Sequence, residues 1–377
     1  MSNINIFTVD VEIDESTVFY NIRENRNFKI DGIYYSDGKY RRLPEEVAQS
    51  VSPAVHNLHA RTTGGRVRFK TDSSYIAIKV VLGNVFQDSN TTVTAQAGFD
   101  MYVRKNASQR FMGVFMPPYQ VEKEYVGKKK TTGEYQEYVI NFPIGSEVEE
   151  LYIGLEEGAT LEKPDPYTYE KPIVFYGSSI TMGKCATRPG CSYENILSQR
   201  LDFNFVNLGF GGAARGEQQI ADYIAGLDMR AFVLDYDHNS PSPEHLTQTH
   251  ERFFKTVREA HKEIPIIIMS RPKKYLSQED KERKHVIEQT YLNALEAGDK
   301  NVYFIPGDSL MNDSVKDCGT VDGTHPTDAG FFSMADAIEK VVRSIYVGSH
   351  EIIVEDGVAK LMNKQAFAGS TATTAFE

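Results

Sequence analysis

Five apolar, strand-like segments alternate with five helix-like segments through the second half of this 377-residue chain. The expected strands are short runs rich in β-branched and aromatic residues, near 173–177, 204–208, 231–236, 264–269 and 302–305. The expected helices lie at 192–201, 215–227, 243–262, 278–297 and 328–346. Such alternation predicts a parallel sheet with helices on both faces, in which ligands bind at the carboxyl ends of the strands.

The first half of the chain has a different periodicity. Residues 66–70, 75–81 and 137–142 alternate between apolar and polar side chains, and turn-forming Gly, Ser and Thr residues separate such segments. This pattern predicts antiparallel strands, and a β-sandwich or jelly-roll domain over residues 1–165. Three prolines in 160–172 predict a linker or strap that wraps the domain boundary.

We therefore expect three units along the chain. The β-domain, 1–165, precedes an α/β domain over 166–348. In the last unit, 349–377, the segments 351–354 and 359–362 predict a hairpin that returns to the N-terminal domain, followed by a mobile tail from residue 366.

Charge and cysteine content exclude several classes of function. With 41 basic and 52 acidic residues the net charge is −11, which disfavours nucleic acid or an anionic membrane as a partner. The N-terminus has no signal-peptide pattern, and three cysteines suit a reducing compartment, so we expect a cytoplasmic protein. No Cys/His cluster has zinc-ligand spacing, and we expect neither a metal nor a cofactor.

Ser179, Asp322 and His325 are the residues most indicative of chemistry. Ser179 follows an apolar strand and a glycine and precedes a helix start, a setting that exposes a nucleophile beside a helix N-terminus. Asp322 lies three residues before His325. A serine needs a base and the base needs an orienting carboxylate, so we expect a Ser179–His325–Asp322 triad.

Two further strand ends offer hydrogen-bond donors for an oxyanion. Gly212 lies in the glycine turn after 203–208, and Asn239 follows the strand near 231–236. A glycine N–H and an asparagine amide, together with the Ser179 N–H, would form a three-donor oxyanion hole.

A literal Gly-Asp-Ser-Leu motif occurs elsewhere, at 307–310. It follows a strand-like run, but the stretch from 311 to 320 is rich in Asn, Asp, Ser and Gly and is typical of a loop. Because Ser309 lacks a following helix, we do not expect it to be the nucleophile.

Ser179, Gly212, Asn239 and His325 resemble the four block residues of the SGNH (GDSL-type) hydrolase superfamily, and Asp322 is similar to that family's triad acid. The first block departs from the family in having Ser178 where many members have Asp, and the third has Ser240 after Asn239. The resemblance covers roughly 171–347 and implies a flavodoxin-like fold. Segments 98–102 and 42–44 resemble the β-rich domain that precedes some SGNH hydrolases.

The resemblance implies an esterase that removes acetyl groups from a small acetylated carbohydrate. Ser178, Arg188, Asp237 and His238 are candidate substrate contacts, although Arg188 is equally interpretable as a surface arginine paired with an acid. The alternatives are another short-chain esterase, thioesterase or acyltransferase on the same triad. A catalytically inactive carbohydrate-binding protein is the alternative from a different class.

Overall fold

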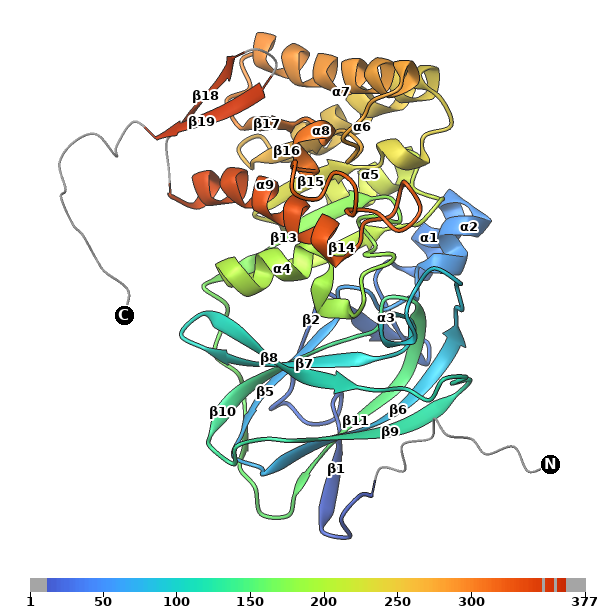
Figure 1. Ribbon diagram of the computed structural model, residues 1–377, viewed down its shortest axis with the longest axis vertical. Helices are drawn as coiled ribbons and strands as arrows, with labels where there is room; N and C mark the ends of the chain where they lie inside the picture. The colour runs from blue at the N-terminus through green and yellow to red at the C-terminus, as the bar shows by residue number, and fades with distance from the viewer. Residues whose placement is uncertain (1–11, 348–349, 356–357, 364–377) are drawn as a thin grey trace, which may run out of the picture.

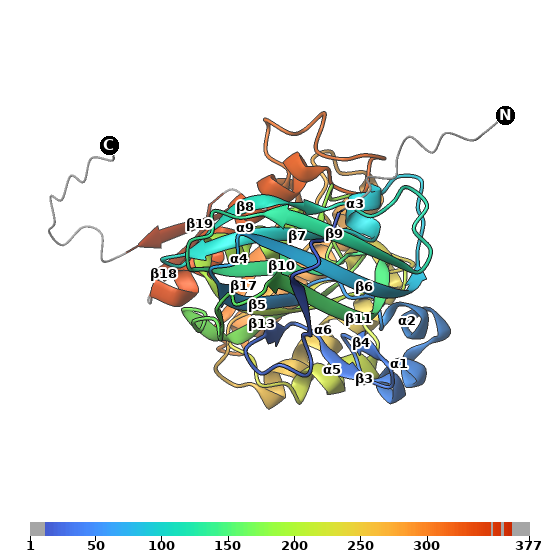
Figure 2. The same cartoon turned by 90° about the horizontal axis from the view of Figure 1, so that it is seen from below.

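The computed structural model describes residues 12–347, 350–355 and 358–363 and arranges them as two stacked domains (Figure 1). A β-sandwich built from the first part of the chain lies below a layered α/β domain. Figure 2 looks onto the sandwich from below. Within the described residues, no helix is long and apolar enough to span a bilayer.

Two antiparallel sheets face each other in the N-terminal domain, which confirms the predicted β-rich region. One has the order β1-β11-β6-β9 and consists of Thr17–Asn21, Ser146–Glu156, Tyr75–Val85 and Glu124–Lys130. The other has the order β12-β5-β10-β7-β8, with β2 also paired to β5. It consists of Leu161–Glu162, Arg66–Thr71, Gln136–Asn141, Phe99–Lys105, Ser108–Phe115 and Lys29–Asp31. Alternate side chains such as Val67 and Phe69 fill the space between the sheets.

Short helices interrupt the β-domain at positions where the hydrophobic periodicity of the sequence did not predict a helix. A small hairpin of β3 (Tyr34–Ser36) and β4 (Lys39–Arg41) leads into α1 (Glu45–Val51) and α2 (Pro53–Leu58), and α3 spans Val93–Gln96. Ser52 caps α2 by accepting the Val55 N–H, and Pro53 begins it. These helices are too short to show a 3.6-residue repeat. Apolar residues of α1 and α2 pack into the core of the α/β domain, not into the sandwich.

The α/β domain confirms the predicted flavodoxin-like arrangement. Its parallel sheet has the order β14-β13-β15-β16-β17, formed by Phe203–Gly209, Tyr169–Gly177, Ala231–Asp235, Ile266–Met269 and Val302–Ile305. One face is covered by α4 (Tyr193–Leu201) and α9 (Asp328–Val347). The other is covered by α5 (Gln218–Ala225), α6 (Pro243–Ala260) and α7 (Gln278–Glu296). The carboxyl ends of the strands therefore meet at one edge.

The last two described strands form a hairpin at the C-terminal end of the described chain. β18 (His350–Glu355) pairs antiparallel with β19 (Val358–Asn363). The hairpin contacts α9 and is drawn beside the α/β domain, away from the sandwich (Figure 1). The expectation that this segment returns to the N-terminal domain stays a prediction. The expected tail from residue 366 lies outside the described residues.

Buried arginines of the N-terminal domain bind the edge strand β14. Arg42 is fully buried, and its Nη1 donates to the carbonyls of Asn207 and Gly209 at 3.0 and 2.8 Å. Its Nε and Nη2 donate to the carbonyls of Arg61 and Leu58, within its own domain. Burial lowers the Arg42 pKa to about 9, and nearby Arg61 lowers it further. The donors of the Arg42 guanidinium are therefore shared between the two domains, and they join one domain to the other.

Candidate active site

Ser179 lies on a tight turn between the end of β13 and the segment that leads to α4. The Ser178 N–H donates to the Asp235 carbonyl at 3.1 Å, and this bond anchors the turn to the neighbouring strand. At Gly177 a Cβ would lie 2.0 Å from Thr181 Oγ1 and 2.3 Å from the Asp235 carbonyl oxygen, so only glycine fits. The turn places Ser179 at the carboxyl edge of the sheet, largely buried but open to a cavity.

The three predicted triad residues form one hydrogen-bonded chain. Ser179 Oγ lies 2.9 Å from His325 Nε2, and His325 Nδ1 lies 2.8 Å from Asp322 Oδ2. With Nδ1 protonated toward the carboxylate, Nε2 can accept the serine proton. This geometry is compatible with the predicted roles of a nucleophile, a general base and an orienting acid.

Asp322 is held in place by four donors. Its Oδ1 accepts the backbone N–H groups of His325 and Thr324 at 2.8 and 3.1 Å. Its Oδ2 accepts the His325 ring and the Asn90 side chain, which reaches over from the N-terminal domain at 3.0 Å. Burial alone would raise the Asp322 pKa, but the hydrogen bonds from His325 outweigh it and hold the pKa well below its usual range. Asn90 is a contact to this site that the sequence did not indicate.

Gly212 and Asn239 lie beside Ser179 and hydrogen bond to each other. The Gly212 N–H donates to Asn239 Oδ1 at 3.2 Å, and Asn239 Nδ2 donates to the Phe210 carbonyl at 2.9 Å. Among the described residues no acceptor binds the Ser179 N–H or the second Nδ2 hydrogen of Asn239. Two donors are thus available at once, and the long Gly212 bond is one that an oxyanion can replace.

Three of the four candidate substrate contacts are buried or already bound to other groups of the protein. Ser178 is buried, and its Oγ accepts the Ile180 N–H. Arg188 Nη1 donates to the buried Asp100 carboxylate at 2.7 Å and to the Tyr102 hydroxyl, and its guanidinium lies over the Phe111 ring. This arrangement favours the alternative in which Arg188 pairs with an acid.

The other two candidates lie next to each other in the short 3₁₀ turn Asp237–Asn239. Asp237 is buried between Arg271 and Arg283, and it accepts the Arg271 N–H. His238 lines the cavity. Burial, with added repulsion from Arg271 and His325, lowers its pKa to about 3, so its imidazole is neutral. Of the two, His238 is therefore the residue placed to meet a substrate.

The cavity above Ser179 measures about 420 Å³, a size that suits a small ligand. Its wall comes from both domains: Leu58, Arg61, Phe86, Asp88, Ser179, Met182, Lys184, Gly211, Gly212, His238, Asn239, Thr324 and His325. Arg61 and Phe86 were not anticipated, because no local pattern marks a residue that reaches a site in another domain.

The literal Gly-Asp-Ser-Leu motif forms a separate structure. It folds into the short helix α8 (Gly307–Leu310), and Ser309 Oγ donates to the Pro306 carbonyl at 2.6 Å. Ser309 does not line the cavity that contains Ser179.

A buried carboxyl group lies directly behind the nucleophile turn. Asp235, at the end of β15, accepts a hydrogen bond from Thr181 Oγ1 at 3.0 Å. Burial raises the pKa of Asp235 to about 8, so this carboxyl is mostly protonated at neutral pH.

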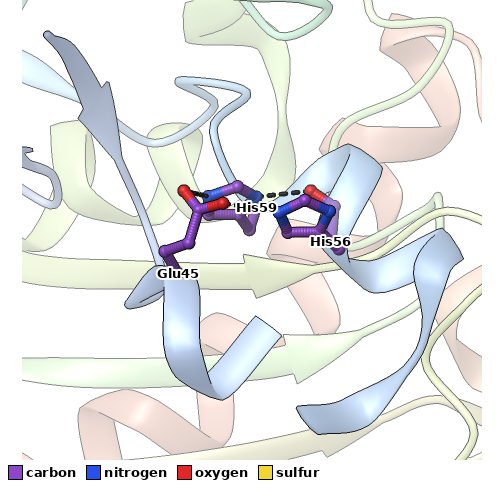
Figure 3. Close-up of side chains that lie close together, drawn as sticks. All are labelled: Glu45, His56 and His59. Atoms are coloured by element: carbon purple, nitrogen blue, oxygen red, sulfur yellow. Dashed lines mark hydrogen bonds and ion pairs between the residues drawn. The ribbon is translucent and has the colours of Figure 1, made fainter. Parts of the chain in front are cut away.

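One group of possible metal ligands lies among the described residues, in the N-terminal helices (Figure 3). The ligand atoms of Glu45, His56 and His59 are within 4.8 Å of one another. His56 Nε2 lies 2.7 Å from Glu45 Oε1, and Arg41 Nη1 contacts both Glu45 Oε2 and His59 Nε2. The guanidinium thus supplies the positive charge that a metal ion would bring, so the group is a complete polar network without one.

Two family profiles match the sequence over most of its length. The GDSL-like lipase/acylhydrolase family matches residues 170–343, and the N-terminus of SGNH-hydrolase-type esterases matches residues 17–161. The chain belongs to the SGNH (GDSL-type) hydrolase superfamily. This SGNH hydrolase is accordingly a carboxylic ester hydrolase.

Solved structures share both domains of the SGNH hydrolase. A GDSL-like lipase from Bacteroides ovatus is 28% identical with a TM-score of 0.78, covering 88% of this chain and 98% of its own. The salicylyl-acyltransferase SsfX3 of a tetracycline biosynthetic pathway is 18% identical with a TM-score of 0.72, covering 89% and 99%. A family two carbohydrate esterase from Clostridium thermocellum, solved with cellohexaose, is 14% identical with a TM-score of 0.60, covering 84% and 98%. The last two are similar in fold alone, and no curated protein matches the sequence.

Proposed function

We propose that this SGNH hydrolase is a serine esterase that removes O-acetyl groups from a carbohydrate. The observation that carries the proposal is the hydrogen-bonded chain from Ser179 through His325 to Asp322. Ser179 attacks the ester carbonyl as His325 takes its proton, and Asp322 stabilises the imidazolium. The alkoxide of the tetrahedral intermediate is stabilised by the Ser179 N–H and Asn239, with Gly212 able to join them.

Collapse of the intermediate expels the alcohol, which takes its proton from His325, and leaves the acetyl group bonded to Ser179 Oγ. Water then attacks this acetyl carbonyl as His325 takes the water proton. The second intermediate collapses, acetate leaves, and His325 returns the proton to Ser179 Oγ. The intact hydrogen-bonded chain argues against an inactive binding protein. The carbohydrate part of the proposal is supported by the fold shared with the family two esterase that was solved with cellohexaose. The cytoplasm is the proposed location, supported by the free cysteines Cys185, Cys191 and Cys318.

The test varies the length of the acyl chain, the alcohol part of the ester and the molecule that accepts the acyl group. p-Nitrophenyl acetate should be cleaved with a higher kcat/KM than the butyrate and octanoate esters, and acetylated oligosaccharides should release acetate. Ser179→Ala is the matched control for both assays. A preference for octanoate would contradict an acetylesterase. If acetyl is transferred to an added alcohol or amine faster than to water, the acyltransferase alternative is favoured. The acyltransferase SsfX3 has the same fold as this chain.

A further inference from the structure

Arg61 places a positive charge in the wall of the active-site cavity. It follows α2 in the N-terminal domain, is only 9% exposed, and lines the same cavity as Ser179. Its guanidinium carbon lies 3.9 Å from the centre of the Phe86 ring, so one face of the guanidinium plane is covered. The side chain is therefore held against the wall.

The positive charge of Arg61 is not matched by an acid. Among the described residues no carboxylate oxygen lies within 4.0 Å of its guanidinium, and none accepts a hydrogen bond from it. The two acids that act on it electrostatically already have partners: Asp88 lies 2.9 Å from Lys184 Nζ, and Glu147 lies 2.8 Å from Lys39 Nζ. The neighbouring Arg42 adds a second positive charge without an acid.

A buried cation without a partner is costly, because water no longer solvates it fully. Burial accordingly lowers the Arg61 pKa. The wall of the same cavity also holds the ion pair of Asp88 and Lys184, whose charges offset each other, so Arg61 carries the positive charge that is left over there. In a protein of net charge −11, this charge is not explained by the general surface charge. A planar guanidinium with free donors is the group that best fits a carboxylate, which it binds through two parallel hydrogen bonds.

We propose that Arg61 selects esters that carry a carboxylate, of which an acetylated sugar acid is the example that the proposed acetylesterase function implies. The inference rests on the proposed esterase function and deepens it. The carboxylate could belong to the alcohol that leaves or to the acyl group that is transferred, and the chemistry of its recognition is the same. The test separates these two sources.

Two matched substrate pairs isolate the charge. For the alcohol side, 4-acetoxybenzoate is compared with its methyl ester, following release of the phenol. For the acyl side, the monophenyl ester of adipic acid is compared with phenyl hexanoate. We expect the charged member of at least one pair to have the higher kcat/KM, and we expect Arg61→Gln to lower that preference roughly 10- to 100-fold. Arg61→Lys should retain part of this preference, because lysine keeps the positive charge but cannot donate two parallel hydrogen bonds from one plane.

Arg26→Gln is the control, because Arg26 is exposed and does not line the cavity, so it should leave the preference unchanged. Equal losses on both members of each pair with Arg61→Gln would overturn the proposal, and so would the absence of any preference in the wild type. Cleavage of p-nitrophenyl acetate by the wild type but not by Ser179→Ala shows separately whether the esterase function holds.

Binding provides a readout that does not need turnover. In the Ser179→Ala background, calorimetric titration with 4-acetoxybenzoate and with monophenyl adipate should show affinity that weakens about tenfold or more when Arg61→Gln is added. Unchanged affinity for both ligands would contradict the proposal even if no tested ester were cleaved. Thermal midpoints of each variant show whether the fold is retained.

Discussion

The carboxylate of Asp100, near the start of strand β7 of the β-sandwich, lies 2.7 Å from Nη1 of Arg188, in the loop that follows Ser179. Asp100 also accepts the Gly190 N–H at 2.8 Å and the Asn141 side chain at 2.8 Å. Burial raises the pKa of this carboxyl in spite of Arg188, which reflects how completely it is removed from water. The sandwich therefore holds the loop that leads from the nucleophile into α4.

That pair predicts a structural role for Arg188. Arg188→Ala would leave Asp100 buried and uncompensated, so the free energy of unfolding should fall by about 3 kcal/mol. The kcat/KM of this variant, measured near neutral pH and below its unfolding temperature, should fall to a similar extent for all esters. Chemical denaturation measures the loss, and the double variant Arg188→Met, Asp100→Asn should recover part of it. A selective loss on sugar esters alone would return Arg188 to the substrate site.

The nucleophile assignment predicts opposite results for two serines. Ser179→Ala should lower kcat by roughly 10⁴- to 10⁶-fold, because the attacking oxygen is removed. Ser309→Ala should retain most activity, because the Ser309 hydroxyl only caps its own turn through the Pro306 carbonyl. Turnover of p-nitrophenyl acetate by the two purified variants decides the matter. If Ser309→Ala were the inactive variant, the site described above would be wrong.

Asp322 should act through orientation of the imidazole and not through its own titration. Because its folded pKa lies below the ordinary value, the carboxylate remains charged as the pH falls to about 4, and its stabilising contribution is lost only in stronger acid. Asp322→Asn should therefore lower kcat by roughly 10³- to 10⁴-fold across the pH profile. Asn90→Ala, which removes one of four donors to this group, should cost far less. Equal losses in the two variants would argue against this account.

The buried carboxyl of Asp235 predicts a stability difference that grows with pH. Its folded pKa of about 8 exceeds the ordinary pKa of 3.8, so between these values the native state binds a proton that the unfolded state does not. Stability from this group is then full below pH 4 and is lost as the pH rises toward 8, by at most about 1.4 kcal/mol per pH unit. Asp235→Asn removes this dependence. The difference between the urea midpoints of the two proteins should grow in favour of the variant as the pH rises from 5 to 8. Parallel curves would show that Asp235 is ionised throughout.

The sequence predicted those parts of the fold that rest on local periodicity. The alternating strands and helices from 173 to 346 are long enough to carry a repeat, and each was found within a few residues of its expected bounds. The Ser179 turn and the Asp322 to His325 spacing are also local. They could be recognised without knowledge of any other part of the chain.

Contacts between the domains could not be predicted in this way. Asn90 and Asp322 are 232 positions apart, and Asp100 and Arg188 are 88 apart, so no spacing rule joins them. Arg188 was equally consistent with a surface pair and with a substrate contact, because an arginine near a site has the same sequence pattern in either role. Arg61 becomes visible only when the cavity wall is assembled.

The division of Arg42's hydrogen bonds between Asn207 and Gly209 on one side and Leu58 and Arg61 on the other has a consequence for how the enzyme accepts its substrate. A motion that separated the domains would break two hydrogen bonds of a buried cation at once. The cavity above Ser179 should therefore have the same width in the free enzyme and with an ester bound. We therefore expect this enzyme to discriminate among esters through the fixed shape of its cavity and not through a clamping motion of the domains.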